Sequence, residues 1–451
     1  MPSASPDSDD PSCSRRAVLA GVAGLPAGIA GRRSGRLRST DRPPATRPVT
    51  VATWNVALGV DLFKLFDARS ADDVREIAGE LLAGARKHPY EARAAAIADA
   101  LVAADADAVA LQEAARIRAG STETDGDGET VADLLDSVRS ALEARDRPYE
   151  VAASTVTTDV ELPVESESGR ETVRLTDRDV LLVRPGVDAR NARGETYDER
   201  MEFPVPGTDR TVALRRGYCR ADVGPEGAAF TAVSTHLESV SASTRRRQAM
   251  ELLDALPADG PVVVGGDFNS GPGTITSAYD ALTDSLTDAH AQLRPDDDGY
   301  TCCRASIVGE GGSRLTKRID GLLARGEARP TAVERLGEES ADRGETTVDG
   351  ETVAVWPSDH AGVVGTFEVP ASAPTQTETR RSTRTRGAET TTGTGTGTPV
   401  PTGPGDEPSA ASGSSAATDD PSGTTNGSGA GFGALAGAAA FVFAALARGR
   451  K

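Results

Sequence analysis

The feature that most constrains the folding of this chain is a change in composition near residue 371. Residues 371–430 consist mainly of Thr, Ser, Gly, Pro and Ala and show no hydrophobic period. Such a segment cannot bury enough apolar surface to offset the conformational entropy that folding costs. We therefore expect a disordered stalk at 371–430 and one folded domain at 49–370.

Within residues 49–370, short apolar runs alternate with segments of helical period. Strands and helices mixed at this density predict an α/β fold in which two sheets pack together with helices outside. The acidic stretches 120–129 and 165–177 are expected to be surface loops. Strands are expected at 48–57, 108–112, 149–157, 179–184, 211–223, 229–235, 261–266, 318–324, 352–355 and 362–368, and helices at 71–87, 91–103, 131–145 and 243–256.

Residues 1–31 have the pattern of an export signal. Arg15 and Arg16 precede an uncharged run of small and apolar residues at 17–31, which resembles a twin-arginine signal. The alternative is an accidental arginine pair ahead of an alanine-rich helix. We expect export of the folded protein, with residues 32–48 as a linker.

Residues 431–451 contain an apolar run that ends in a basic tail, residues 448–451. At about 16 residues the run is shorter than the roughly 20 that a membrane-spanning helix needs. The segment resembles a sorting signal of the kind that archaeosortase-type enzymes cleave, although Ala430 stands where those signals carry proline. A plain membrane anchor is the alternative, and both predict a protein tethered outside the cell by its C-terminus.

The charge of the chain bears on habitat more than on substrate. A net charge of −19 excludes a bulk basic surface for non-specific nucleic-acid binding. The 49 basic residues include only four lysines. We interpret this balance as that of a protein from hypersaline surroundings, where salt screens an acidic coat.

Four cysteines are present, and Cys13 would be removed with the export signal. Cys219, Cys302 and Cys303 remain, so one thiol must be free or paired outside the chain. No spacing of Cys and His fits a zinc site. The favoured arrangement is a structural disulfide between Cys219 and one of the adjacent pair.

Six short stretches place polar groups at the ends of expected strands. Each stretch alone is weak evidence for a functional site. Asn55 can simply cap a turn, and His236 can be a core histidine whose hydrogen bonds are satisfied. A more specific pattern follows the valine run at 262–264, where Asp267 and Asn269 are two apart on an extended segment and point the same way. The six stretches are Thr53-Trp54-Asn55, Leu111-Gln112-Glu113, Ser234-Thr235-His236-Leu237, Gly266-Asp267-Phe268-Asn269, Arg318-Ile319-Asp320 and Ser358-Asp359-His360.

In this order and at these separations, the six stretches resemble the endonuclease/exonuclease/phosphatase superfamily. That superfamily includes pancreatic-type deoxyribonucleases, inositol phosphatases and bacterial sphingomyelinases. The resemblance covers residues 49–367. It implies a four-layer αββα sandwich of two packed mixed β-sheets, which agrees with the pattern of expected elements.

The resemblance also implies a site for Mg²⁺, or for Mn²⁺ or Ca²⁺. Glu113 would be the metal carboxylate and Asn55 its amide companion, with Asp359 near the same ion or a second one. Mg²⁺ prefers oxygen ligands of this kind. A hard cation neutralises the non-bridging oxygens of a phosphodiester during hydrolysis.

Five further residues take catalytic roles by the same resemblance. His360 would act as general base on water, and Asp320 would accept a hydrogen bond from its other ring nitrogen. Asp267 is a competing base, because members of the superfamily differ in the carboxylate that activates the water. Asn269 and His236 would donate to the phosphate.

We therefore expect an exported, metal-dependent phosphodiesterase that acts on nucleic acid or on a phospholipid headgroup. Ala57 stands where abasic-site endonucleases carry aspartate, which favours other branches. A nuclease is the leading hypothesis, and a phospholipase C or sphingomyelinase-like enzyme is the close alternative, given the membrane tether. A catalytically idle surface binding protein is disfavoured because each expected polar position is filled. No obligate protein partner is indicated.

Overall fold

The computed structural model describes residues 45–121, 128–166, 169–204, 211–225, 227–273, 276–309, 314–348 and 350–371. All of these belong to Pro44–Lys451, one of the two units into which the chain divides. The expected export signal, the C-terminal anchor and nearly all of the stalk lie outside the described residues. Of the helices that the structure describes, none has the length and apolar character to cross a membrane.

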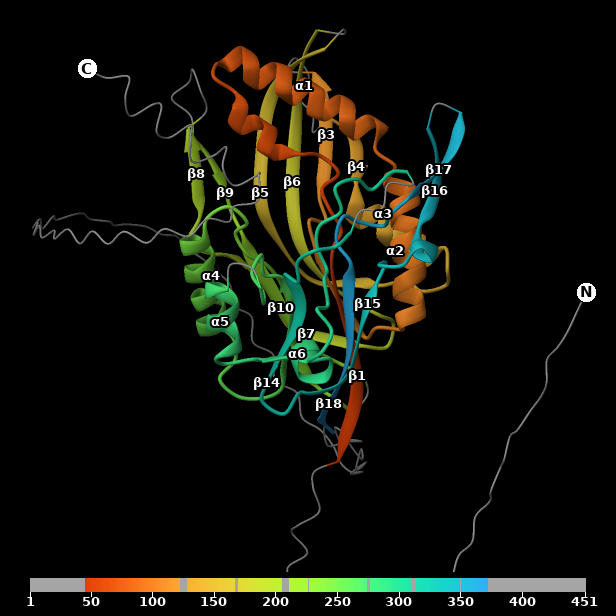
Figure 1. The fold of residues 1–451 in the computed structure, drawn as a ribbon, viewed down its shortest axis with the longest axis vertical. Coiled ribbons are helices and arrows are strands. Elements are labelled where there is room, and N and C mark those ends of the chain that lie inside the picture. The colour runs from red at the N-terminus through yellow and green to blue at the C-terminus, as the bar shows by residue number, and fades with distance from the viewer. Residues whose placement is uncertain are drawn as a thin grey trace, which may run out of the picture. The chain divides into compact units, whose positions relative to one another are not determined.

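Two mixed sheets form the centre of the domain (Figure 1). The first sheet has the order β15-β18-β1-β2-β6-β3-β4, and β5 pairs with β6 beside this path. β1 runs parallel to β2 and antiparallel to β18. The strands are β1 (Thr46–Asn55), β2 (Ala108–Gln112), β3 (Arg116–Ser121), β4 (Glu129–Asp133), β5 (Glu150–Ser166), β6 (Gly169–Val183), β15 (Arg329–Leu336) and β18 (Gly362–Pro370).

The second sheet has the order β13-β14-β12-β11-β10-β7. Its strands are β7 (Asp188–Thr196), β10 (Gly217–Gly224), β11 (Phe230–His236), β12 (Val262–Asp267), β13 (Thr287–Asp288) and β14 (Asp320–Arg325). Two strand pairs stand outside the main sheets. They are β8 (Met201–Pro204) with β9 (Thr211–Leu214), and β16 (Gly344–Val348) with β17 (Glu351–Val355).

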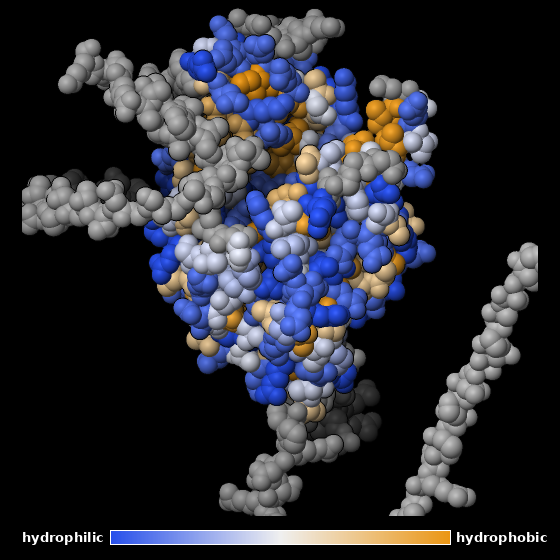
Figure 2. All heavy atoms as spheres, in the orientation of Figure 1, coloured by the Kyte–Doolittle hydropathy of each residue, from blue (hydrophilic) through white to orange (hydrophobic). Residues whose placement is uncertain are grey.

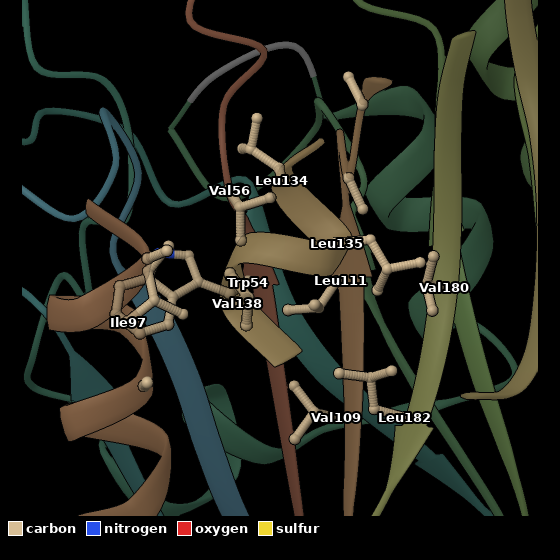
Figure 3. Packing of buried hydrophobic residues seen from close by; sticks show 14 of the residues in the cluster. Trp54, Val56, Ile97, Val109, Leu111, Leu134, Leu135, Val138, Val180 and Leu182 are labelled. Atoms are coloured by element: carbon tan, nitrogen blue, oxygen red, sulfur yellow. The ribbon is translucent and has the colours of Figure 1, made fainter. Parts of the chain in front are cut away.

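Helices cover the outer faces of both sheets. Ile97 of α2 and Val138 of α3 belong to one buried cluster with Trp54 of the first sheet (Figure 3), and α4 and α5 pack on the second sheet. Between the sheets lies a separate apolar core. The expected four-layer αββα arrangement is confirmed. The helices are α1 (Ala71–Lys87), α2 (Tyr90–Ala104), α3 (Leu134–Glu143), α4 (Ala242–Ala255), α5 (Ser277–Thr283) and α6 (Ala289–Leu293), with 3₁₀ turns η1 (Leu62–Asp67) and η2 (Ser340–Asp342).

The best-predicted elements have clear local signals. α1 begins where the Ser70 side chain accepts a hydrogen bond from the backbone N–H of Asp73, and it carries Arg86 and Lys87 in its last turn. An N-cap and a basic C-terminal turn both stabilise a helix. The expected bounds, 71–87, are those of the structure.

The expected loop at 165–177 is wrong, because β5 and β6 extend together as a long hairpin. Leu175 of β6 is buried, and Val164 of β5 packs against Leu82 of α1. α1 therefore supplies the apolar cover that these polar-looking strands need. The expected strand at 211–223 is also interrupted, because β9 ends at Leu214 and β10 begins at Gly217.

The expected disulfide of Cys219 is wrong as well. Cys302 and Cys303 form a disulfide with each other, and Cys219 is a free, buried thiol. Its Sγ lies 3.6 Å from the backbone oxygens of Ala153 and Asp179, within the core between the sheets. Cys219 is therefore a small core residue.

Candidate active site

The alternation of strand residues brings the predicted polar side chains to one rim of the two sheets. Apolar side chains at every second position of β1, β11, β12 and β14 face the core between the sheets. The same alternation turns Asn55, His236, Asp267 and Asp320 inward where these strands reach the rim. In the register of the second sheet, Asp267 is the neighbour of both His236 and Asp320.

Close approach of the two sheets makes these contacts possible. A Cβ added at Gly265 of β12 would lie 2.9 Å from Cβ of Thr53 on β1. This is too short for a real contact, so a glycine is needed for the sheets to pack this tightly. Two residues further along each strand, Asn55 and Asp267 meet.

Asn55 joins two carboxylates at the centre of the rim. Its Nδ2 donates to Oε1 of Glu113 at 3.1 Å and to Oδ2 of Asp267 at 3.0 Å. The other oxygen of Glu113 accepts from the backbone N–H of Leu58 at 2.8 Å. Residues from β1, from the end of β2 and from β12 are thereby held within one hydrogen-bonded group.

The backbone is unusual at three of these strand ends. Ala57, Glu113 and Asn269 adopt positive φ angles of 56°, 57° and 49°. Asparagine tolerates this left-handed conformation, whereas alanine and glutamate adopt it at a cost of order 1 kcal/mol. Each turn redirects the chain just after its strand, which sets the direction of Glu113 and Asn269.

His360 and Asp320 form a second hydrogen-bonded group. His360 Nδ1 lies 2.9 and 3.1 Å from the two carboxylate oxygens of Asp320, and both residues are buried. Because an ionised carboxylate only accepts, Nδ1 carries the proton. Thr301 supports the pair by donating its hydroxyl to Asp320 Oδ2 at 2.6 Å.

The surrounding carboxylates favour the charged form of His360. Burial disfavours the charged ring, but the nearby Asp320 and Asp359 outweigh it and raise the pKa of His360 well above its usual value. Without a bound cation, these carboxylates therefore favour the charged form of His360 at neutral pH.

The segment that carries Asp359 and His360 is fixed to β1 and α2. Ser358 donates its hydroxyl to the backbone oxygen of Asn55 at 2.7 Å. The buried Arg93 of α2 donates to the backbone oxygens of Pro357 at 2.9 Å and Ala57 at 3.1 Å. Asp359 itself is half-buried at the same rim.

His236 has the opposite environment. NH1 of Arg216 lies 3.0 Å from His236 Nδ1. A guanidinium can only donate, so Nδ1 accepts and the neutral ring carries its proton on Nε2. Burial and the charge of Arg216 lower the pKa of His236 well below its usual value. His236 is therefore neutral.

The amide of Asn269 lies beside the ring of His236. Nε2 of His236 lies 3.0 Å from Nδ2 of Asn269 and 3.4 Å from Oδ2 of Asp267. The Asn269 amide also donates to the backbone oxygen of Leu237 at 2.9 Å. Neighbouring donors of this kind can both serve one anionic oxygen.

The carboxylates at the rim repel one another. Burial, with added repulsion from Asp177 and Asp359, raises the pKa of Glu113 to about 7. Burial and the neighbouring Asp320 raise the pKa of Asp267 to about 6. Excess negative charge that is hydrogen-bonded but not neutralised fits a bound cation.

Two groups of described residues have ligand atoms within 4.8 Å of one another, as a metal site requires. One is Asp267, Asp320 and His360, at the rim. The other is Cys302, Cys303 and His360, where Cys303 Sγ lies 4.0 Å from His360 Nε2. The two carboxylates of the first group are of the ligand type that a hard cation prefers, but the proton on His360 Nδ1 keeps that nitrogen from being a ligand. The sulfur atoms of the second group are engaged in their disulfide.

The structure thus brings all eight predicted residues to one rim, and it adds residues that the motifs missed. Arg216 contacts His236 and faces Asp177 at 3.8 Å. Asp179 is fully buried, with no hydrogen-bond partner for either carboxylate oxygen in the described part of the chain. Asp177 and Asp179 are two residues apart at the start of an apolar run in β6. This spacing is the feature of the sequence that could have identified them.

Comparison with known proteins agrees with this geometry. The sequence profile described as the Endonuclease/Exonuclease/phosphatase family matches residues 52–360, which include all eight site residues. None of the curated proteins compared with the chain matches it.

Several solved structures resemble the chain at low sequence identity. A family protein from Bacteroides thetaiotaomicron is 17% identical, with a TM-score of 0.43 over 72% of this chain and 99% of the other. The mannosyl-6-phosphatase Bt3783 of the same species is 17% identical, with a TM-score of 0.41 over 70% and 98%. D. rerio TDP2, in complex with single-strand DNA product, is 17% identical, with a TM-score of 0.39 over 71% and 98%. Likenesses at this level carry no inference about substrate.

Proposed function

Because the chain belongs to the endonuclease/exonuclease/phosphatase family, we propose that it is a divalent-metal-dependent phosphoesterase that hydrolyses phosphodiester bonds. One observation carries the proposal. The hydrogen-bonded group of Asn55, Glu113 and Asp267 lies at the same rim as the ion pair of Asp320 and His360. Carboxylates, a cationic ring and N–H donors together can meet each need of phosphoryl transfer.

Glu113, Asn55 and Asp359 would hold the cation, for which Mg²⁺ is the proposed identity and Mn²⁺ or Ca²⁺ the alternatives. Carboxylate oxygens suit such a cation, and a bound cation would offset the burial and the repulsion from Asp177 and Asp359 that raise the pKa of Glu113. When bound, a hard cation neutralises phosphate oxygens and so favours attack by water.

Asp267 is the stronger candidate for the base that activates water. His360 is held in its charged form by Asp320, so it has no free lone pair to accept a proton at neutral pH. Asp267 lies between the two imidazoles, with Oδ2 3.4 Å from His236 Nε2 and 4.0 Å from His360 Nδ1. We therefore prefer Asp267 to His360 as the base, whereas the sequence resemblance favours His360.

The remaining residues bind the phosphate. His360 would supply positive charge, and His236 and Asn269 would supply neutral N–H donors. Arg216 fixes the tautomer in which His236 can donate from Nε2.

Hydrolysis of bis-p-nitrophenyl phosphate at high salt tests the proposal. We expect activity with Mg²⁺ that chelation abolishes, and a loss of roughly 10²–10⁴-fold in Glu113→Ala and in Asp267→Asn. Full activity in both folded variants would refute it. A panel of DNA, RNA, phospholipids and inositol phosphates would then identify the substrate class, including the nuclease and phospholipase C-like alternatives.

We further propose that the protein works outside the cytoplasm of a salt-adapted cell, tethered at its C-terminus. The support is the sequence of residues 1–31 and 431–451 together with the acidic composition. Fractionation of cells that express the wild-type chain or the Arg15→Lys, Arg16→Lys double variant tests this. Retention of only the double variant in the cytoplasm is the expected result, and equal export of both would contradict it.

A further inference from the structure

The two cysteines beside His360 have no role in the proposed reaction. Cys303 Sγ lies 4.0 Å from His360 Nε2, and the ligand atoms of Cys302, Cys303 and His360 are all within 4.8 Å of one another. Cys303 is exposed, whereas the other two residues are buried. Hydrophilic side chains cover most of the described face of the domain in Figure 2. A surface of this kind offers more to ions than to apolar partners.

The hydrogen bond at the other nitrogen of His360 orients the ring for a metal. Nδ1 lies 2.9 Å from Asp320 Oδ2 and carries the proton of that bond. A histidine that binds a metal through one ring nitrogen usually donates its other N–H to a carboxylate, which fixes the direction of the ring. Nε2 is therefore the nitrogen that remains for a ligand role, and it is the one near Cys303.

The distances suit a tetrahedral ion once the disulfide is opened. Zn²⁺ binds thiolate sulfur at about 2.3 Å and imidazole nitrogen at about 2.0 Å, so two such ligands lie about 3.6 Å apart. The 4.0 Å between Cys303 Sγ and His360 Nε2 is close to this separation. In the disulfide the two sulfur atoms are bonded to each other. A phosphine and one water molecule convert it to two thiols and a phosphine oxide, which frees both sulfur atoms to bind an ion.

Backbone hydrogen bonds hold the cysteine segment in place without the disulfide. The N–H groups of Thr301 and Cys302 donate to the backbone oxygen of Lys317 at 2.7 and 2.9 Å. Beyond the pair, the N–H of Arg304 donates to the backbone oxygen of Asp359 at 2.8 Å. A disulfide between adjacent residues closes a minimal loop, so it restricts the unfolded chain very little. We therefore expect the reduced thiols to stay beside the imidazole.

We propose that the reduced protein binds a thiophilic divalent cation, of which Zn²⁺ is the type, through the thiolates of Cys302 and Cys303 and through Nε2 of His360. Binding releases the two thiol protons and the proton that Nε2 carries when the ring is charged. Water completes the tetrahedron on the exposed side of Cys303. Thiolates select such a cation, whereas the carboxylates at the rim select Mg²⁺, so the two sites differ in the ions that they prefer.

Occupation of this site would remove His360 from the role that we propose for it. A ring whose Nε2 is bound to Zn²⁺ cannot offer that nitrogen to a phosphate. This consequence rests on the proposed function, whereas the binding of the cation does not. With Mg²⁺ in excess, we expect the Zn²⁺ concentration that half-inhibits hydrolysis of bis-p-nitrophenyl phosphate to fall about 10-fold or more after reduction.

Cobalt binding tests the site without requiring turnover, because a thiolate bound to Co²⁺ gives a near-ultraviolet charge-transfer absorption that oxygen ligands do not give. The full chain is reduced with a phosphine, freed of the reductant without access to air, and titrated with Co²⁺ in excess Mg²⁺. The absorption should appear in the reduced protein and not in the oxidised protein. Zn²⁺ should displace the Co²⁺ and remove the absorption.

Three variants assign the ligands. Cys303→Ser should abolish the absorption, and His360→Gln should weaken the binding of Co²⁺ by about 10-fold or more. The matched control is the double variant Cys13→Ser, Cys219→Ala, which removes the other two thiols of the chain and should bind Co²⁺ as the wild type does.

The outcomes separate the two proposals. No absorption in the reduced wild type, an unchanged absorption in Cys303→Ser, or equal affinity in His360→Gln overturns the cation site. Loss of cooperative thermal unfolding on reduction also overturns it, because the site needs the imidazole in its folded position. A cobalt absorption that follows these expectations, in a protein that never hydrolyses bis-p-nitrophenyl phosphate, would support the cation site and refute the proposed function.

Discussion

The two halves of the site hold the same side chain in opposite charge states. On the side of Asp320, His360 donates from Nδ1 to a carboxylate and is a cation. On the side of β10, His236 accepts from Arg216 at Nδ1 and is neutral. Nδ1 faces a carboxylate in His360 and a guanidinium in His236. This difference gives the two rings different charges.

The difference explains how the site can bind an anion and still activate water. One cationic ring attracts the phosphate, whereas the neutral ring beside Asp267 adds a donor without a second positive charge. A cationic ring at both positions would stabilise the ionised form of Asp267 and weaken it as a base.

The largest expected effect comes from removing the carboxylate on the His360 side. Asp320→Asn should lower kcat by roughly 10²–10⁴-fold. The raised pKa keeps His360 charged above its usual range, and activity is lost as pH rises through that pKa. Without Asp320 the pKa of His360 falls, so the alkaline limit of the pH–rate profile should move to lower pH. An unchanged alkaline limit would show that Asp320 does not act through His360.

Substitution of glutamine for each histidine tests whether the rings of His236 and His360 differ in charge. A glutamine amide can replace a neutral Nε2–H donor but not a charged ring. His236→Gln should therefore lose no more than about 10-fold in kcat/KM, and His360→Gln about 10²-fold or more. Alanine at each position is the control, because it removes the donor as well. Equal losses for the two glutamine variants would mean that the rings have the same charge.

Substitution of Arg216 tests the environment of His236 in this comparison. Arg216→Met leaves Asp177 buried without its cationic partner, which should cost about 3 kcal/mol in the free energy of unfolding. Arg216→Lys keeps a charge and should recover part of this. Urea unfolding of both variants measures the difference, and identical midpoints for Met and Lys would exclude an electrostatic role.

The smallest effect concerns stability and pH. The pKa values of Glu113 and Asp267, raised to about 7 and about 6, mean that the folded state binds more protons than the unfolded state between pH 4 and 7. Stability without metal should therefore fall as pH rises through this window. Mg²⁺ should raise Tm by a few degrees more at pH 7.5 than at pH 5. A metal effect on Tm that does not change with pH would argue against Glu113 as a ligand of the cation.

Sequence reasoning found the residues that stand at strand ends within recognisable motifs. Asn55, Asp267 and Asp320 could be placed together because the period of two turns them to the same face. α1 was placed correctly because its cap and its charged ends are local signals.

The residues that were missed depend on contacts across the fold. Nothing near Arg216 in the sequence shows that its guanidinium meets a histidine of the neighbouring strand. The sequence predicts a loop at 165–177, in the outer part of the β5–β6 hairpin, because the apolar cover of this part comes from α1, far away in the chain. The order of the two bases likewise depends on which carboxylate faces which ring, and local sequence does not contain that information.

Nitrogen-15 NMR of the imidazole rings is the most direct test of the central claim, and a chain with only four histidines makes assignment by single substitution practical. From pH 6 to 8, in the metal-free protein, we expect His360 to be protonated on both nitrogens and His236 to be protonated only on Nε2. A His360 ring that titrates near its ordinary pKa of 6.5, or a doubly protonated His236, would contradict it.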